Sequence, residues 1–263
     1  MIKFSIITIT YNAASVFNRT VESVLHQHYR QVEHIIIDGA STDKTLALAK
    51  DYMERSYASS NGHDIRIVSE PDNGIYDAMN KGIAHAPGDY ICFLNAGARL
   101  PSDDTLDRIV SNAALSETQT EGFPLPAVLY GDTHVVDANG RFLHRRRLTP
   151  PEQLTWRSFK HGMLVCHQAF YVRTDIAREV PYDLQYKYSA DVDWCIRIMR
   201  LAGERGLQLK NVHAVLANYL QEGTTTRHHK ESLKERFHIM CHYYGSFSTV
   251  CMHLWFAVRN IIK

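Results

Sequence analysis

Four short apolar segments alternate with helix-like segments at the start of the chain, and this alternation restricts the fold more than any other sequence feature. The apolar segments cover residues 2–10, 32–39, 64–71 and 89–95 and are rich in β-branched residues. Their apolar residues run largely without interruption, which is typical of parallel strands covered by helices on both faces. The sequence therefore predicts an α/β fold with a mainly parallel central sheet flanked by helices.

The segments between these strands have the apolar spacing of helices and cover residues 15–28, 41–56 and 74–86. Ser41 opens the second of them, and we expect its side chain to act as the N-cap of that helix. The order strand, helix, strand, repeated in this way, is typical of a parallel sheet in which each connection crosses over through a helix.

The regular alternation ends near residue 100, and the elements after it are less uniform. The pair Asn139-Gly140 predicts the tight turn of a hairpin. Gly206 is expected to close a long helix. The predicted elements are helices over residues 102–117 and 188–206 and from about His228 and Ser246, and strands over residues 167–173 and 210–220.

Charge and cysteine content exclude several classes of protein. Lys and Arg number 29 and Asp and Glu 28, so the net charge of +1 gives no general reason to bind nucleic acid. The 5 Cys residues are scattered without a CxxC motif, which weighs against disulfides and zinc and indicates a reduced, cytoplasmic protein. The first apolar segment is interpreted as a strand rather than a signal peptide, and no stretch has the length of a membrane-spanning helix.

Ligands of parallel α/β sheets bind beyond the carboxyl ends of the strands, so the residues at these ends are the first candidates for a site. Neither GxGxxG nor GxxxxGK[ST] follows the first strand, which weighs against dinucleotide and P-loop sites and predicts no organic cofactor. Tyr11 offers a ring for a base or ribose, and Asp38 can accept a hydrogen bond from a nucleoside. Alternatively, Asp38 is only a favourable charge near a helix N-terminus.

The stretches "SIITITYN", "IIIDGASTDKT", "SEPDNGIYDAMNKGIAHAPGDYICFLNAG", "CHQAFYVR" and "SADVDWCIRIM" resemble glycosyltransferase family 2, and in particular the branch that builds bacterial capsule, exopolysaccharide and O-antigen units. The resemblance runs from residue 2 to about residue 200. It implies a GT-A fold with a nucleotide-sugar-binding half at residues 1–100 and an acceptor-binding and catalytic-base half at 101–225. Residues 226–263 are expected to form a C-terminal helical extension.

The resemblance also implies roles for individual residues on the donor side. Met79 stands where the family often has an arginine that contacts the diphosphate. Lys81 either replaces this contact or is a solvated helical lysine. The residues expected to bind the nucleotide-sugar are Thr10, Tyr11, Asn12, Asp38, Asp72, Asn73, Asn80, Lys81 and Asn95.

Asp191 matches the catalytic base of the family, which removes the proton of the acceptor hydroxyl as the new C–O bond forms. Asp193 lies on another face of the predicted helix, and we expect it to cap the helix or pair with Arg197. His167 and Gln168 match a position near the acceptor, although a lone His is also common as a structural residue.

The metal motif of the family is incomplete in this chain. Mg²⁺ or Mn²⁺ would be expected at the end of the fourth strand, but Ala98 stands where the family has an Asp ligand. Three explanations stay open: Asn95 binds a metal weakly, the enzyme needs no metal, or activity has been lost. In the second case Arg99 or the cluster Arg145-Arg146-Arg147, with Arg145 and Arg147 as the named candidates, would hold the diphosphate. Alternatively, the cluster is an exposed strand end with solvated charges.

The predicted function is an inverting glycosyltransferase that moves a sugar from a nucleotide-sugar to a lipid-linked oligosaccharide. The alternative is a catalytically inactive nucleotide-sugar-binding subunit of a polysaccharide assembly complex. A nucleotidyltransferase is disfavoured because no Gly-rich basic loop follows the first strand. The amphipathic end of the chain, with Trp255, Phe256, Arg259 and Lys263, fits peripheral contact with the inner face of the plasma membrane, or packing on the protein body or on a second copy as a homodimer.

Overall fold

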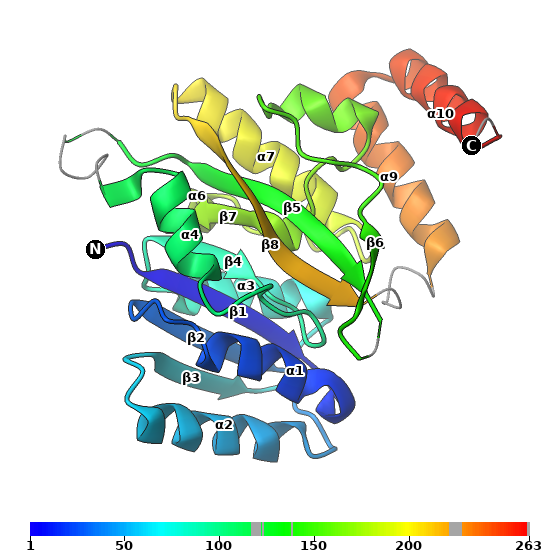
Figure 1. Cartoon of the computed structure of the whole chain (residues 1–263). Coiled ribbons are helices and arrows are strands. Elements are labelled where there is room, and N and C mark those ends of the chain that lie inside the picture. The colour runs from blue at the N-terminus through cyan, green and yellow to red at the C-terminus, as the bar shows by residue number, and fades with distance from the viewer. Residues whose placement is uncertain (117–121, 123, 138, 221–227, 262–263) are drawn as a thin grey trace.

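The structure, a computed structural model, describes residues 1–116, 122, 124–137, 139–220 and 228–261. Its centre is a sheet of strand order β3-β2-β1-β4-β7-β5-β6, in which β8 also pairs with β5 (Figure 1). The strands are β1 (Phe4–Thr10), β2 (Val32–Asp38), β3 (Asp64–Ser69), β4 (Tyr90–Phe93), β5 (Val128–Val136), β6 (Phe142–Arg145), β7 (Phe170–Arg173) and β8 (Leu209–Leu220).

The sheet is parallel in its first half and mixed in its second. β1 pairs in parallel with β2 and β4, and β2 pairs in parallel with β3. β7 runs antiparallel to β4 and β5, β6 runs antiparallel to β5, and β8 is parallel to β5. The predicted α/β fold with a mainly parallel sheet is therefore confirmed, with β6 and β7 as the antiparallel strands.

Helices cover both faces of the sheet, and α9 and α10 extend from the end opposite α2 (Figure 1). Short 3₁₀ helices η1 (Trp156–His161) and η2 (His167–Ala169) lie in the connections of the second half. The α-helices are α1 (Ala14–Leu25), α2 (Thr45–Ser59), α3 (Ile75–His85), α4 (Thr105–Asn112), α6 (Thr174–Glu179), α7 (Ala190–Glu204), α9 (His229–Tyr244) and α10 (Ser246–Ile261).

The continuous apolar character of β1 follows from burial on both faces. Every residue of β1 is buried. Ile7 and Ile9 belong to the core that contains Trp194 of α7, whereas Phe4 and Ile6 belong to the core that contains Ile109 of α4. Because successive side chains of a strand point to opposite faces, a strand between two helical layers needs an apolar residue at nearly every position.

Two local predictions have different outcomes. The hairpin at Asn139-Gly140 is confirmed, since β5 and β6 pair in antiparallel fashion and Gly140 has a φ of +82°. The N-cap prediction for Ser41 is wrong, because α2 begins at Thr45 and the Ser41 hydroxyl instead donates to the carboxylate of Asp38. Asp43 accepts the backbone N–H of Thr45 at 2.8 Å and so satisfies the first turn of α2.

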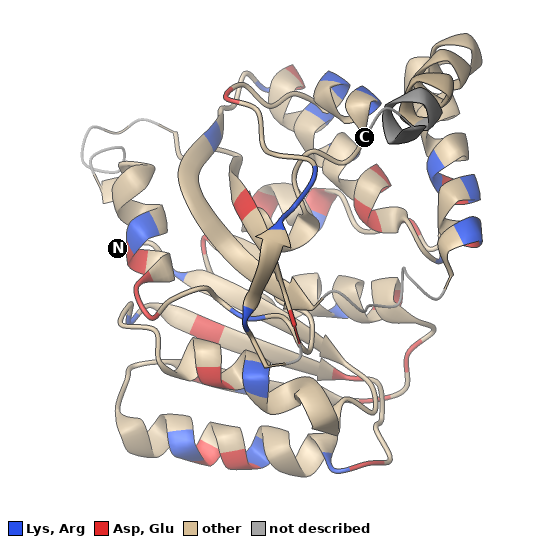
Figure 2. Ribbon diagram, turned by 45° about the vertical axis from the view of Figure 1, so that its right-hand side comes forward, with Lys and Arg blue, Asp and Glu red and all other residues tan. Residues whose placement is uncertain are grey.

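Charged residues of both signs are distributed over the helices in the ribbon of Figure 2, while the central strands carry few of them. All five cysteines are free thiols. Within the described ranges, none of the helices combines the length and the apolar character that a membrane crossing demands.

A close approach between α3 and β1 depends on Gly82. A Cβ atom at this position would lie 2.4 Å from Cγ2 of Ile7, whereas a Cβ atom at Gly203 of α7 would meet nothing within 4 Å. Both glycines are helical, so they form a matched pair.

We expect Gly82→Ala to destabilise the protein, because overpacking costs about 1–3 kcal/mol and exceeds the gain in helix propensity of about 1 kcal/mol. Gly203→Ala has only the gain in helix propensity and causes no overpacking. The free energy of unfolding of this variant should therefore be equal to that of the wild type or slightly higher. Urea denaturation of both variants checks this, and equal unfolding free energies for the two would contradict the packing argument.

Candidate active site

One cavity of about 680 Å³ lies at the carboxyl ends of β1 and β4. The β1 and β4 ends contribute because parallel strands bring their carboxyl ends to one edge of the sheet. Segments distant in the sequence close its other walls, including the start of α7, the end of β8 and α9. Its lining is Ile9, Thr10, Tyr11, Ala13, Asp72, Gly74, Ile75, Tyr76, Met79, Asn95, Ala96, Gly97, Ala98, Arg146, Met163, Cys166, His167, Gln168, Lys187, Tyr188, Asp191, Tyr219, Leu220 and Arg236.

On the side of the first strands, the structure brings together four of the predicted donor-binding residues: Thr10, Tyr11, Asp72 and Asn95. Tyr11 is 65% exposed, so its ring is free to pack against a flat ligand. A Cβ atom at Gly39 would lie 2.4 Å from the Asp72 carboxylate and 3.4 Å from the Tyr11 ring. The glycine thus permits the loop after β2 to lie against these two side chains.

Asp38 does not line the cavity. Its side chain is fully buried and accepts hydrogen bonds from the Ser41 backbone at 3.1 Å and the Ser69 hydroxyl at 2.6 Å, in addition to the Ser41 hydroxyl. Asn12, with a φ of +48°, accepts the backbone N–H of Thr42 at 2.9 Å. Both residues therefore shape the loops behind Tyr11 in this structure.

Three further predicted residues make structural contacts outside the cavity lining. The backbone N–H of Asn73 donates to Asp77 at 2.9 Å. Lys81 donates to the carbonyl of Pro71 at 2.7 Å and pairs with Glu70 at 2.8 Å, so it is neither a diphosphate contact here nor simply solvated. Asn80 makes two hydrogen bonds, of 3.0 and 2.7 Å, with the backbone of Tyr182.

Asp191 lies in the first turn of α7 and points into the cavity with 14% of its side chain exposed. Its Oδ1 accepts the backbone N–H of Val192 at 3.0 Å and lies 3.4 Å from the Tyr76 hydroxyl. Tyr76 stacks on Tyr182, and Tyr182 stacks on Trp194, with centroid distances of 5.4 and 4.7 Å. This stack joins α3 to α7 and sets the position of the Tyr76 hydroxyl.

His167 Nδ1 lies 3.4 Å from the second oxygen of Asp191. Burial by itself would lower the pKa of His167, but its hydrogen bonds to Asp191 and to Cys166, and the charges of these groups, raise that pKa to about 10. Burial would likewise raise the pKa of Asp191, but His167 and the charge of Arg236 lower it. The pair is therefore a carboxylate and an imidazolium at neutral pH.

Asn95 is the third member of the polar cluster that contains His167 and Asp191. Its amide nitrogen lies 3.4 Å from His167 Nε2, while its Oδ1 is buried and has no hydrogen-bond partner in the part of the chain that the structure describes. Since both ring nitrogens of a protonated His are donors, a 180° rotation of the Asn95 amide would bring Oδ1 to Nε2 and satisfy both groups. Gln168 accepts the backbone N–H of Asn95 at 3.1 Å, so both residues of the predicted His-Gln pair contact Asn95.

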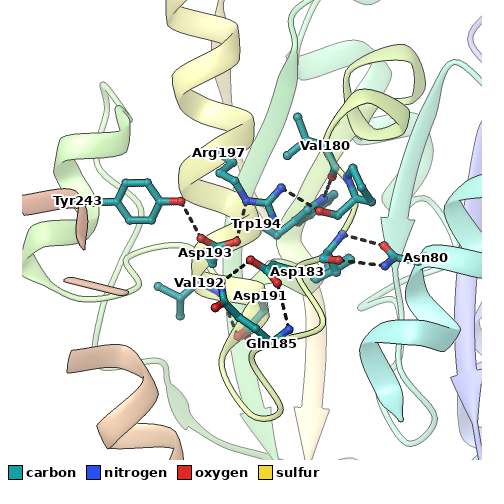
Figure 3. A network of polar contacts seen from close by, with 12 residues as sticks. Asn80, Val180, Asp183, Gln185, Asp191, Val192, Asp193, Trp194, Arg197 and Tyr243 are labelled. Carbon is teal, nitrogen blue, oxygen red and sulfur yellow. Dashed lines mark hydrogen bonds and ion pairs between the residues drawn. The ribbon is translucent and has the colours of Figure 1, made fainter. Parts of the chain in front are cut away.

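Asp193 has the structural role expected of it. It pairs with Arg197 at 2.6 Å and accepts the hydroxyl of Tyr243 from α9 at 2.7 Å (Figure 3). Figure 3 also shows Asn80 directed at the segment before α7 and not at Asp191. The two acids of α7, two positions apart, therefore face different surroundings, as the geometry of a helix requires.

The Lys and Arg residues that line the cavity are Arg146, Lys187 and Arg236, and of these only Arg146 belongs to the predicted cluster. Arg145 and Arg147 are exposed and outside the lining, and Arg99 makes a backbone bridge with Asn218. Arg146, the middle residue of the same run, lines the cavity together with Arg236 of α9. Of the predicted cluster, Arg146 therefore lines the cavity while the named candidates Arg145 and Arg147 do not, because alternation along an extended segment sends neighbouring side chains in opposite directions.

Sequence reasoning missed Arg236 because it treated residues 226–263 as an appendage. α9 is instead attached to the segment before α7, the helix that carries Asp191: Glu235 accepts the backbone N–H groups of Lys187, Tyr188 and Ser189 at 2.8, 2.8 and 2.9 Å. This carboxylate satisfies donors just ahead of α7 and fixes the position of its neighbour Arg236. The only sequence signal that pointed to Arg236 was the mixture of basic, acidic and apolar residues in this segment.

The residues at the strand end do not fit a divalent metal site of ordinary composition. Mg²⁺ and Mn²⁺ prefer several carboxylate oxygens. Ala98 presents a methyl group, and nowhere in the described parts of the chain do three or more His, Cys, Asp or Glu side chains gather around a common point. The lining carboxylates are Asp72 and Asp191, and Asp191 is paired with His167.

Comparisons with known proteins agree with this geometry. The sequence model described as glycosyl transferase family 2 matches residues 5–179, which is more than half of the chain. The chain belongs to glycosyltransferase family 2. A PGL/p-HBAD biosynthesis glycosyltransferase of Mycobacterium bovis is 32% identical over 234 residues, covering 88% of this chain and 82% of the relative. The amylovoran biosynthesis glycosyltransferase AmsB of Erwinia amylovora is 28% identical over 242 residues, covering 89% and 75%.

Solved structures of similar fold include complexes with nucleotide-sugars. Residues 1–349 of S. aureus TarS in complex with UDP-GlcNAc have a TM-score of 0.60 at 15% identity, covering 84% of this chain and 59% of that one. The mannosyltransferase PcManGT of Pyrobaculum calidifontis in complex with GDP-Man and Mn²⁺ has a TM-score of 0.57 at 15% identity, covering 100% and 76%. This family 2 glycosyltransferase therefore has the GT-A fold.

The His167–Asp191 pair makes the stability of this glycosyltransferase depend on pH. Because the folded pKa of His167 is raised from 6.5 to about 10, its contribution to stability is full below about pH 6.5, declines as the pH rises and is lost above about pH 10. We expect the stability of the wild type to fall over this window more steeply than that of His167→Gln. Urea denaturation at pH 6, 8 and 10 checks this, and parallel profiles for the two proteins would contradict the charged pair.

Proposed function

We propose that this enzyme transfers a sugar from a nucleoside diphosphate sugar to a hydroxyl group with inversion at the anomeric carbon. The observation that carries the proposal is that Tyr11 and Asp72 of the donor side and Asp191 of α7 line one cavity. Its volume of about 680 Å³ is within the ordinary range of ligand sites. UDP-GlcNAc and GDP-Man in the complexes of TarS and PcManGT support a nucleotide-sugar as the donor.

The reaction balances with a single base. The acceptor oxygen forms a bond to the anomeric carbon while the bond from that carbon to the diphosphate oxygen breaks. The proton of the acceptor hydroxyl moves to Asp191, and the nucleoside diphosphate leaves with the electron pair. Since attack and departure occur on opposite faces of the sugar, one displacement inverts the configuration.

The surroundings of Asp191 prepare it for this role. His167 keeps the carboxylate ionised at neutral pH, and the Val192 N–H orients one of its oxygens. The burial of the pair keeps bulk water away from the carboxylate. The low pKa means that proton transfer is favourable only as the acceptor oxygen loses electron density to the new C–O bond.

The proposed acceptor is a lipid-linked oligosaccharide of a bacterial surface glycan. The names of the relatives support this class, since one acts in PGL/p-HBAD biosynthesis and another in amylovoran biosynthesis. An enzyme that uses such an acceptor acts at a membrane surface. We propose that this surface is the cytoplasmic face of the plasma membrane. Whether the enzyme is active or is a silent nucleotide-sugar-binding subunit is decided by the experiments that follow.

We expect Asp191→Asn to lower turnover by about 10²- to 10⁴-fold, because general base catalysis contributes this much. Nucleotide binding should be retained, since the amide keeps the shape of the side chain. Asp193→Asn is the matched control: it should reduce stability by loosening Arg197 and Tyr243 while the folded fraction keeps its turnover.

The measurement is release of nucleoside diphosphate from UDP-, GDP- and dTDP-sugars, with synthetic polyprenyl-diphosphate saccharides as acceptors. NMR of the product gives the anomeric configuration. Near-normal turnover of Asp191→Asn, or a product with retained configuration, would refute the mechanism. Absence of turnover with every donor, together with intact nucleotide-sugar binding, would favour the silent subunit.

The proposed membrane contact is the outer face of α10. Phe247, Val250, Leu254 and Trp255 are 85%, 46%, 63% and 54% exposed at helical spacing. An exposed apolar stripe of this kind is stabilised at the boundary between lipid headgroups and acyl chains.

We expect the triple change Phe247→Ser, Leu254→Ser, Trp255→Ser to lower binding to phosphatidylglycerol-containing vesicles by about tenfold or more. Tyr57→Ser on α2, which removes an aromatic side chain that is 89% exposed, should leave binding unchanged. Vesicle flotation measures both. If the wild type fails to float but forms a dimer that the triple change dissociates, α10 contacts a second copy instead.

A further inference from the structure

The departing nucleoside diphosphate gains negative charge as the bond to the sugar breaks, and a site must stabilise that charge. A divalent metal commonly does so, but it needs carboxylate ligands. Here Ala98 has no ligand atom and is only 4% exposed, and the amide of Asn95, the other candidate ligand, lies with its nitrogen 3.4 Å from Nε2 of a protonated His167. The positive charge has to come from another part of the cavity.

Arg146 supplies a positive charge whose position is fixed by contacts with the backbone. Its Nη1 donates to the carbonyl of Leu164 at 3.1 Å and lies 3.5 Å from that of Leu148. Both carbonyl contacts use Nη1, and the side chain of Tyr219, which also lines the cavity, interacts with Arg146 as well. These contacts hold the guanidinium in place, and its five N–H groups give it donors beyond them. Its charge acts within the site, since it lowers the pKa of Cys166 together with His167, against the effect of burial.

Arg236 supplies a second cation from a distant part of the chain. Among the described residues, its buried Nε has no hydrogen-bond partner and no ion pair includes it. A buried charged donor without a partner is costly, and a bound anion would remove this cost. The hydrogen bonds of Glu235 to residues 187–189 hold this part of α9 against the start of α7.

We propose that Arg146 and Arg236 bind the diphosphate of the donor and stabilise it as the leaving group, so that transfer does not require a divalent metal. The inference rests on the proposed function, since it assigns the electrostatic part of the same displacement. As the C–O bond to the sugar breaks, the electron pair goes to the diphosphate oxygen, and both guanidinium groups stay protonated. The arginines contact the leaving group, and Asp191 accepts the proton of the acceptor.

The test is titration calorimetry in EDTA with UDP, GDP and dTDP and with the corresponding nucleosides. We expect the wild type to bind one diphosphate without metal. Arg146→Gln and Arg236→Gln should each weaken diphosphate binding by about 10- to 100-fold and leave nucleoside binding unchanged, because only the diphosphate meets the guanidinium groups. The exposed neighbours Arg145 and Lys234 give the matched controls Arg145→Gln and Lys234→Gln, which should change neither.

Arg146→Lys and Arg236→Lys keep the charge and should recover part of the affinity, which separates charge from folding. The inference is overturned if the wild type binds the diphosphate only with Mn²⁺ or Mg²⁺, or if the Gln variants match their controls. In that case the loss of turnover in Asp191→Asn would still support the proposed function. If the wild type binds no nucleoside diphosphate with or without metal, the proposed function and this inference fail together.

Discussion

The stack of Tyr76, Tyr182 and Trp194 is the contact on which the cavity depends, because it joins the two halves of the chain at the point where they share a site. Tyr76 belongs to α3 and Trp194 to α7, and Tyr182 lies between their rings. Asn80 of α3 holds the backbone of Tyr182 through two hydrogen bonds. The position of Asp191 relative to Tyr11 and Asp72 is therefore set by aromatic packing and by one half-buried amide.

The electrostatics of the cavity follow from this arrangement. Asp191 is largely buried, and a buried carboxylate persists only with compensating charge and hydrogen bonds. His167 supplies the nearest charge and Arg236 a further one. α9 is therefore part of the cavity wall and not a separate appendage. Its Arg236 lines the cavity, and its Glu235 accepts a backbone N–H of the segment that precedes α7.

Much of the fold could be predicted from the sequence. The first four strands were evident because burial on both faces requires continuous apolar residues. The hairpin was evident because Asn-Gly suits a turn with positive φ. Ser41 was misinterpreted because a serine near a helix start can bond to either side, and the nearby Asp38 carboxylate is the acceptor that it meets.

The sequence by itself determined the α/β class, the family resemblance and the position of Asp191 in its motif, because periodicity and short motifs are local properties of the chain. Only the tertiary structure decided which arginine of the run enters the cavity, that Arg236 joins it, and that Asn80, Lys81 and Asp38 are engaged by other protein groups. The physical reason is that a side chain's partners depend on which segments meet in space. Residues 146, 191 and 236 come from separate elements, and no local pattern records that the packing of α7 and α9 brings them together.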